Sequence, residues 1–282
     1  MEVRDDELER FEAEGAPALP VAEEQGYEGH DWARIWYSTY GAGMPVILLH
    51  GGLGHGGNWG YQVPMLVRDG YRVVLIDSRG HGRSTRDEGP FSYELMASDV
   101  AAVMDRLRVE RAAIVGWSDG ACTALVLART APERVAGVFF FACNMDPSGT
   151  KPFEETVALK RCFARHGKDY AALSDTPKKF RELVDDLGVM QRTQPDYSAD
   201  DLAGIRVPVV IAQSEHDEFI KREHAEYLAK AIPGAELIVL EEVSHFAPLQ
   251  RPEVFSRAVS RFLEGLRATE GFLPSGCAQG AE

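Results

Sequence analysis

The sequence predicts an α/β fold in which a mostly parallel central sheet is flanked by helices. Short apolar runs alternate with amphipathic segments of helical length along most of the 282-residue chain. Continuous apolar runs are typical of parallel strands that are covered on both faces, and their alternation with helices indicates right-handed βαβ units. A chain of this length commonly forms one main domain with insertions.

The expected elements follow one another along the chain. A turn near residues 29–31 lies within a segment of strand character, which suggests an antiparallel pair over residues 26–40. Ser92 is a plausible N-cap for a helix whose apolar residues repeat at helical spacing. The other strands are expected at residues 46–49, 71–76, 112–115, 135–142, 207–213 and 235–240. The helices of the core are expected at residues 59–67, 92–107, 121–129, 221–232 and 252–266.

The alternation of strands and helices breaks between residues 144 and 204. Helical segments at residues 152–166 and 177–187 occur there, with no convincing strand between them. We interpret residues 144–204 as an inserted helical cap whose apolar face either covers the site or packs on the main domain. The remaining divisions are the core (26–143 and 205–268), an acidic, solvated N-terminal arm (1–25) and a flexible tail (269–282).

Charge and cysteine content argue against several classes of protein. The formal net charge is −14, which repels nucleic acids and anionic membrane surfaces. The four cysteines form no Cys-x-x-Cys pair, so neither a zinc site nor a small disulfide scaffold is expected. The N-terminus lacks a signal-like apolar region, and no run of about 18 apolar residues occurs. We expect a cytoplasmic protein with a small-molecule substrate and no metal, nucleic-acid or membrane partner.

The segment Gly116-Trp117-Ser118-Asp119-Gly120 carries the main chemical signal, because it joins an apolar run to a stretch of helix formers. In a sharp strand-to-helix turn the middle residue is strained, and small residues two positions away allow strand and helix to approach. Such a turn exposes a serine hydroxyl near backbone N–H groups that can stabilise a developing oxyanion. Ser118 is therefore the candidate nucleophile, although this short pattern also arises by chance.

A serine nucleophile requires a base and an acid that orients the base. His245 follows the last expected strand and Asp217 follows the strand before it, so both belong to loops at the carboxyl ends of strands. The order Ser118, Asp217, His245 is the one expected when such a turn carries the nucleophile. Glu215 and Glu218 remain alternatives for the acid.

Other polar residues near these loops have structural interpretations. His216 adjoins the candidate acid and His224 lies on the following helix, so each is more typical of a surface or loop histidine than of a base. Asp77 also follows a strand, but its neighbours suggest that it braces a loop. His50 could orient its loop without titrating in catalysis.

An oxyanion hole needs two donors, and the backbone N–H of Asp119 is the first candidate. The second is expected from the loop His50-Gly51-Gly52-Leu53-Gly54, because glycine lets a backbone N–H approach the substrate closely. Gly52 is the first choice and Leu53 the second, and a simple tight turn is the alternative. No G-x-x-x-x-G-K-[ST] pattern accompanies the loop, so a nucleotide site is not expected.

Taken together and in order, these motifs make residues 26–266 resemble the α/β-hydrolase family. The matching pieces are His50-Gly51-Gly52, the segment from Asp77 to Ser84, the pentapeptide around Ser118, Asp217, and Ser244-His245-Phe246. Within the family, the pentapeptide and the small cap are similar to valacyclovir hydrolase-like serine esterases. The resemblance implies an α/β-hydrolase fold, two-step hydrolysis through an acyl-enzyme, and no cofactor. Ser118 argues against dehalogenase and epoxide-hydrolase chemistry, which use an aspartate at this position.

The neighbours of Ser118 suggest a substrate but leave alternatives open. The carboxylate of Asp119 could pair with a substrate ammonium, or it could cap the helix or face solvent. Leu53, Trp117 and Phe246 are candidates for an apolar substrate pocket, and core packing is equally plausible for the two aromatic residues. We expect a carboxylic ester or lactone of a small, partly apolar acid. The alternatives are an aminoacyl-ester or amide hydrolase, including a proline iminopeptidase-like enzyme, and a non-catalytic ligand receptor on the same fold.

Overall fold

The computed structural model describes residues 7–270, which fold around one eight-stranded sheet. The strands are ordered β1-β2-β4-β3-β5-β6-β7-β8, and β2 runs antiparallel to both of its neighbours while the other pairs are parallel. The predicted mostly parallel sheet, with its antiparallel pair at the start, is therefore confirmed. The strands are β1 (Glu24–His30), β2 (Ala33–Tyr40), β3 (Met44–Leu49), β4 (Tyr71–Ile76), β5 (Ala112–Trp117), β6 (Val135–Phe141), β7 (Val209–His216) and β8 (Glu236–Ser244).

Helices cover both faces of the sheet and fill the insertion between β6 and β7. Ser92 caps the helix that follows it, because its hydroxyl accepts the backbone N–H of Leu95 at 3.1 Å. The helices are α1 (Leu8–Glu14), α2 (Gln62–Arg68), α3 (Tyr93–Arg106), α4 (Asp119–Thr130), α5 (Val157–Leu173), α6 (Phe180–Thr193), α7 (Ala199–Ala203), α8 (Arg222–Ala231), α9 (Ala247–Gln250) and α10 (Pro252–Glu270). Short 3₁₀ helices occur at Gly56–Trp59, Pro132–Arg134 and Pro147–Gly149.

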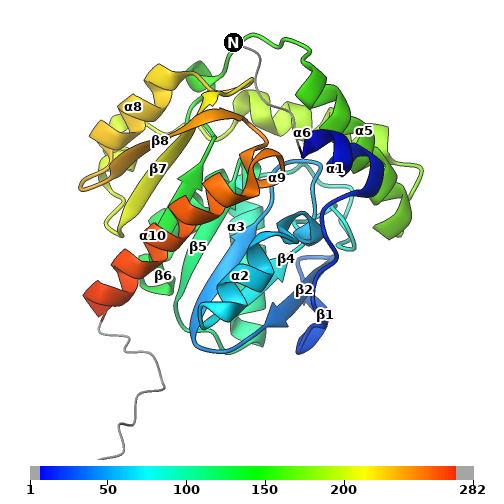
Figure 1. Cartoon of the computed structure of the whole chain (residues 1–282), viewed down its shortest axis with the longest axis horizontal. Helices are drawn as coiled ribbons and strands as arrows, with labels where there is room; N and C mark the ends of the chain where they lie inside the picture. The colour runs from blue at the N-terminus through cyan, green and yellow to red at the C-terminus, as the bar shows by residue number, and fades with distance from the viewer. Residues whose placement is uncertain (1–6, 271–282) are drawn as a thin grey trace, which may run out of the picture.

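Strand β3 shows why the core strands are apolar throughout. Successive side chains of a strand point to opposite faces, so Ile47 and Leu49 join a buried cluster that includes residues of α3 and α4. Val46 and Leu48 join a second cluster on the opposite face, with residues of α2 and α10. Figure 1 views the sheet from the side of α10, which crosses in front of the strands. Both faces of β3 are therefore buried, and polar side chains on either face would destabilise the strand.

The predicted helical insertion contains α5, α6 and the short α7, and α5 and α6 lie together at one end of the sheet (Figure 1). Helix α1 packs beside them and departs from the prediction of a solvated arm. Leu8 and Phe11 are buried, and Arg165 of α5 donates a hydrogen bond to the carbonyl of Ala13 at 3.3 Å. The acidic composition concealed two apolar residues at i and i+3, which form one side of a short helix.

The last helix, α10, extends to Glu270, which is further than expected. Residues 271–282, which make up most of the predicted flexible tail, lie outside the described residues, as do residues 1–6. Within residues 7–270, no helix has the length and apolar character needed to cross a membrane.

The turn from β5 into α4 depends on close contact between backbones. A Cβ atom on Gly120 would lie 2.3 Å from the carbonyl oxygen of Leu49 in β3. A Cβ atom on Gly116 would lie 2.5 Å from the Cα atom of Ala121 in α4. Both distances are far below van der Waals contact, so only glycine permits the two strands and the helix to approach this closely.

Replacing Gly120 by alanine is expected to reduce the free energy of unfolding by about 2–3 kcal/mol, because the new methyl group overlaps backbone atoms that cannot move independently. Urea denaturation measures this difference. The matched control is Gly265→Ala in α10, where no atom lies within 4 Å of the added Cβ. That variant should be neutral or more stable by up to about 1 kcal/mol, since alanine favours a helix interior. Equal stability of the two variants would contradict the close packing at Gly120.

Candidate active site

A cavity of about 340 Å³ lies between the carboxyl ends of the strands and the helices α5 and α6. This edge of a parallel sheet is where α/β proteins bind ligands, and the volume suits a small molecule. Asp217 lies behind the wall, bound to the ring of His245. The other residues that the sequence singled out for the site all line the cavity: Gly52, Leu53, Trp117, Ser118, Asp119, His245 and Phe246.

Ser118 sits at the end of β5 in the strained conformation that a strand-to-helix turn imposes. Its φ of 53° and ψ of −123° lie outside the regions that ordinary residues favour, at a cost of about 1–3 kcal/mol. A hydrogen bond of 2.9 Å from its backbone N–H to the carbonyl of Phe141 in β6 helps to hold it. The geometry leaves the side chain of Ser118 at the cavity wall rather than in the core.

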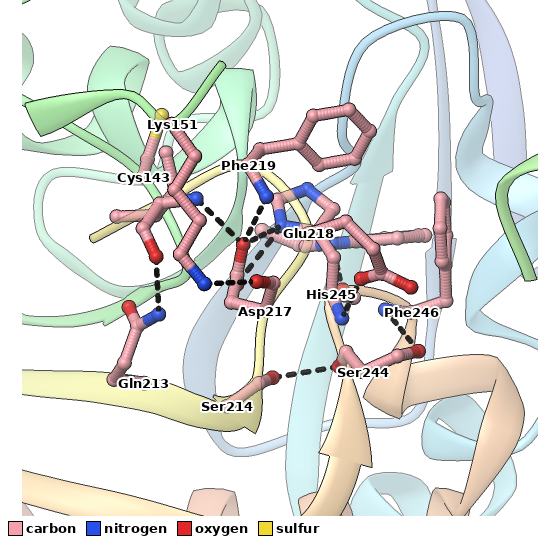
Figure 2. A network of polar contacts seen from close by, with 12 residues as sticks. Cys143, Lys151, Gln213, Ser214, Asp217, Glu218, Phe219, Ser244, His245 and Phe246 are labelled. Carbon is pink, nitrogen blue, oxygen red and sulfur yellow. Dashed lines mark hydrogen bonds and ion pairs between the residues drawn. The ribbon is translucent and has the colours of Figure 1, made fainter. Parts of the chain in front are cut away.

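His245 and Asp217 form a buried pair beside the cavity. The Nδ1 atom of His245 lies 3.1 Å from Oδ2 and 3.2 Å from Oδ1 of Asp217. The backbone N–H groups of Phe219 and Ile220 donate to Oδ1 of the same carboxylate at 2.9 and 2.8 Å, so its orientation is fixed (Figure 2). A carboxylate at Nδ1 favours the tautomer with its proton there, which leaves Nε2 free to accept a proton.

Burial would by itself lower the pKa of His245, but the charge and hydrogen bond of Asp217 outweigh it, with further contributions from Glu218 and Asp119. The net effect is a pKa above the ordinary value for histidine. The site therefore stabilises the imidazolium that forms when this histidine takes a proton.

The two other candidate acids bind backbone groups of nearby residues. Glu218 accepts the backbone N–H of His245 at 2.8 Å, and burial raises its pKa. Glu215 accepts the backbone N–H of Glu242 at 2.8 Å and is exposed. In the structure, Asp217 is thus the carboxylate that contacts the ring of His245, whereas Glu218 positions the backbone of that residue.

The other histidines near the site hold loops. The Nε2 atom of His50 accepts the backbone N–H of Ser78 at 2.9 Å, and its Nδ1 donates to the carbonyl of Gly51 at 2.8 Å. Burial lowers its pKa to about 3, so it stays neutral. The Nε2 atom of His224 accepts the backbone N–H of Met145 at 3.1 Å. His216 lies 3.7 Å from Glu215 and is partly exposed.

The glycine-rich loop after β3 packs directly on the turn that holds Ser118. A Cβ atom on Gly51 would lie 3.1 Å from Cβ of Ser118, and one on Gly52 would lie 2.6 Å from Oδ2 of Asp119. Leu53 has a positive φ of 66°, an uncommon conformation that turns the chain away. The backbone of Gly52 therefore passes close to Ser118 and Asp119, where an oxyanion donor would be needed.

The side chain of Asp119 faces neither solvent nor an empty part of the cavity. Its Oδ1 accepts a hydrogen bond from the hydroxyl of Tyr93 at 2.8 Å, and its Oδ2 accepts one from Gln191 in α6 at 2.9 Å. Burial raises the pKa of this carboxyl group. Neither Tyr93 nor Gln191 was predicted from the sequence. Tyr93 stands at the start of an expected helix, and Gln191 lies 72 residues from Asp119 in a segment that contains no motif.

Trp117 and Phe246 both pack in the core and line the cavity. Trp117 donates its indole N–H to the carbonyl of His245 at 2.9 Å, and its ring centroid lies 6.1 Å from that of Phe246 in an edge-to-face arrangement. Both residues are almost fully buried, yet both line the cavity. They pack in the core and also wall the site, so the two alternatives predicted for them coexist.

Within the described part of the chain, no group of three or more His, Cys, Asp or Glu side chains is placed to hold a metal ion. Cys122, Cys143 and Cys162 are buried.

Comparison with known proteins finds relatives that cover most of the chain. Residues 44–161 match the family model described as the alpha/beta hydrolase fold. RutD from Azorhizobium caulinodans is 27% identical over 262 residues, which cover 82% of this chain and 95% of the relative. The human serine hydrolase BPHL is 26% identical over 251 residues, or 82% of this chain and 83% of the relative. The structure of Est816, described as an N-acyl homoserine lactone degrading enzyme, is 28% identical, with a TM-score of 0.65 over 84% of this chain and all of that one. The chain therefore has the α/β-hydrolase fold and is similar in sequence to these hydrolases.

The carboxylate of Asp77 holds the loops around the site, as its position in the sequence suggested. It is fully buried, and it accepts the backbone N–H of Gly56 at 2.6 Å and that of Arg83 at 2.8 Å. These bonds tie the loop after β3 to the loop after β4.

Replacing Asp77 by asparagine should therefore lower the free energy of unfolding by about 2–4 kcal/mol, because one backbone N–H would face an amide donor in a dry site. Chemical denaturation measures the change. The control Asp196→Asn alters an exposed carboxylate and should stay within about 0.5 kcal/mol of the native protein. A similar result for both variants would show that the buried bonds of Asp77 contribute nothing.

Proposed function

We propose that the protein is a serine hydrolase that cleaves a small carboxylic ester or lactone through an acyl-enzyme. The observation that carries the proposal is the meeting of a strained serine with a buried His–Asp pair at one cavity. Ser118 lies at the cavity wall, and His245 reaches the same cavity with Asp217 bound behind it. A pure binding module has no need of this combination.

In the proposed reaction, His245 accepts the proton of the Ser118 hydroxyl through Nε2 while the serine oxygen attacks the substrate carbonyl. The backbone N–H groups of Gly52 and Asp119 stabilise the negative charge that develops on the carbonyl oxygen. His245 then protonates the leaving oxygen, and the acyl-enzyme forms. Water, deprotonated by the same histidine, attacks the acyl-enzyme and releases the acid. Asp217 holds the ring of His245 and stabilises its charged form throughout.

The cavity lining supports a partly apolar acyl group. Side chains of Leu53, Val184, Leu187 and Phe246 contribute apolar surface, and burying a methylene group there is favourable by about 0.8 kcal/mol. A relative that degrades an N-acyl homoserine lactone, Est816, supports the inclusion of lactones, whose cleavage requires the same attack on a carbonyl. We infer a small-molecule ester or lactone with a short acyl chain.

The contacts of Asp119 bear on the aminoacyl alternative. Each carboxylate oxygen already accepts a hydrogen bond, one from Tyr93 and one from Gln191, so the carboxylate links the core to α6. We therefore favour an ester or lactone over an aminoacyl ester or amide. Faster cleavage of an amino-acid anilide than of the matched simple ester would overturn this preference.

Ser118→Ala is expected to lower kcat for p-nitrophenyl butyrate by at least about 10³-fold, because the nucleophile is removed and only binding remains. Release of p-nitrophenol measures the rate. The matched control is Ser260→Ala on α10, whose hydroxyl contacts only the sulfur of Met65 at 3.7 Å. A fluorophosphonate should label the native protein and the control but not Ser118→Ala. Unchanged turnover in Ser118→Ala would refute the nucleophile, and an unlabelled native protein would favour a receptor.

The pH dependence follows from the raised pKa of His245. Only the neutral ring accepts a proton, so kcat/KM should fall as the pH decreases, with a midpoint above the ordinary histidine pKa of about 6.5. Asp217→Asn removes the charge that opposes the effect of burial, so the midpoint should move to lower pH and the rate should drop by about 10³- to 10⁴-fold. Glu215→Gln, which alters an exposed carboxylate near the end of β7, is the control and should leave the midpoint in place. A midpoint that Asp217→Asn does not move would exclude the pair as its origin.

A further inference from the structure

The wall of the cavity contains a lysine that the proposed reaction does not use. Lys151 lies in the segment between β6 and α5, and it lines the cavity although the residue as a whole is exposed. Among the described residues that line the cavity, it is the only lysine or arginine. Because the protein has a formal net charge of −14, a cation at this place is not part of a general basic surface.

Lys151 is held against the loop that follows β7. Its backbone N–H donates a hydrogen bond to the carbonyl of Phe219 at 2.6 Å, and the preceding residue, Thr150, forms a β-bridge with Ile220. Its side-chain Nζ donates to the backbone carbonyl of Asp217 at 2.6 Å (Figure 2). The backbone and the ammonium of Lys151 are therefore both anchored to one short segment of chain.

The ammonium of Lys151 retains the capacity to bind an anion. An ammonium group has three N–H donors, and the carbonyl of Asp217 takes one of them. Within residues 7–270, Lys151 forms no ion pair with a carboxylate. Hydrogen bonds between two charged groups are stronger than those between neutral groups. The ammonium therefore suits an anionic oxygen group of a ligand better than a neutral one.

The contacts of Lys151 place it beside the catalytic histidine of the proposed reaction. Phe219, whose carbonyl binds the backbone of Lys151, packs edge-to-face on the ring of His245 with ring centroids 4.7 Å apart. Asp217 binds the ammonium of Lys151 through its backbone carbonyl and Nδ1 of His245 through its carboxylate. Since His245 would protonate the leaving oxygen, the leaving group lies on this side of the cavity.

An anionic group on the other side of the cavity would meet a carboxylate. Asp119 lines the cavity next to Ser118, and its side chain is bound by Tyr93 of α3 and Gln191 of α6. Like charges that come together in a binding site disfavour the ligand that brings them. The charges of the cavity wall therefore favour a substrate anion beside Lys151 and disfavour one beside Asp119.

Building on the proposed ester or lactone hydrolysis, we propose that Lys151 is a substrate-binding residue whose ammonium binds a carboxylate on the leaving group. The preferred substrates are esters and lactones in which the alcohol side of the scissile bond carries a carboxylate. Phe153 and Phe219 line the same cavity and suit the hydrocarbon part of such a leaving group. The product released from this side then carries a hydroxyl group and a carboxylate.

Matched acetate esters test the proposal: 4-acetoxybenzoate, whose leaving group is anionic, against neutral 4-acetoxybenzamide, together with the corresponding 3-isomers. Each kcat/KM is divided by the rate of spontaneous hydrolysis, which corrects for intrinsic reactivity. In the native protein the anionic member of at least one pair should be preferred by about 5-fold or more, as expected for a charge-assisted bond at an exposed site. Lys151→Met should abolish this preference, and Lys151→Arg should retain most of it. Lys168→Met, at an exposed position of α5, is the control and should leave it unchanged.

A second pair of esters tests the side of the substrate that Lys151 binds. p-Nitrophenyl hydrogen glutarate carries its carboxylate on the acyl chain, and p-nitrophenyl pentanoate is the neutral match. The native protein should not prefer the glutarate ester. A preference for it that Lys151→Met removes would overturn the assignment of Lys151 to the leaving group.

Product inhibition provides a measurement that does not depend on the reactivity of the ester. 4-Hydroxybenzoate should inhibit the hydrolysis of p-nitrophenyl butyrate more strongly than 4-hydroxybenzamide does, and Lys151→Met should remove this difference. Equal use of the anionic and neutral acetates by the native protein, or a preference that persists in Lys151→Met, would overturn the role of Lys151 while leaving the hydrolase intact. Absence of turnover with every ester, including p-nitrophenyl butyrate, would instead overturn the proposed function, and this inference with it.

Discussion

The close approach of three backbone segments at the end of β5 is the constraint on which the site depends. Gly51, Gly116 and Gly120 lack the Cβ atoms that would separate the loop after β3, the strand β5 and the helix α4. Because these segments touch, Ser118 is forced into a positive φ and the loop of Gly52 passes beside it. The strain is tolerated because the strands on either side of β5 are buried and fully hydrogen-bonded. The proposed nucleophile and the proposed oxyanion donors are thus positioned by backbone packing.

The same dry interior gives two histidines opposite properties. Burial by itself acts to lower the pKa of both His50 and His245, because the charged imidazolium loses its hydration in the interior. Both ring nitrogens of His50 bond to backbone groups, so it stays neutral and holds two loops together. His245 has Asp217 at Nδ1, and the carboxylate reverses the direction of the shift. One neighbouring charge therefore separates a structural histidine from one suited to proton transfer.

The sequence predicted the parts of this arrangement that depend on local pattern. Apolar runs indicated the core strands, and the order of Ser118, Asp217 and His245 followed from which strand each residue terminates. What it could not predict depends on contacts between distant segments. Asp119 is bound by Tyr93 and by Gln191, and neither residue belongs to a motif. The apolar side of α1 was too short to distinguish a docked helix from a solvated arm, because its burial depends on a surface that α5 provides.

Helix α5 links the start of the chain to the wall of the cavity. The ring of Phe11 in α1 lies 5.9 Å from that of His166 in an edge-to-face arrangement, so the N-terminal helix packs against this part of α5. On the same helix, Asp169 binds both Arg165, at 2.7 Å, and His55 of the glycine-rich loop, at 3.4 Å. These contacts fix α5 against the loop that carries the proposed oxyanion donor. The helix that lines the cavity and the loop that would carry the oxyanion donor therefore share one set of contacts.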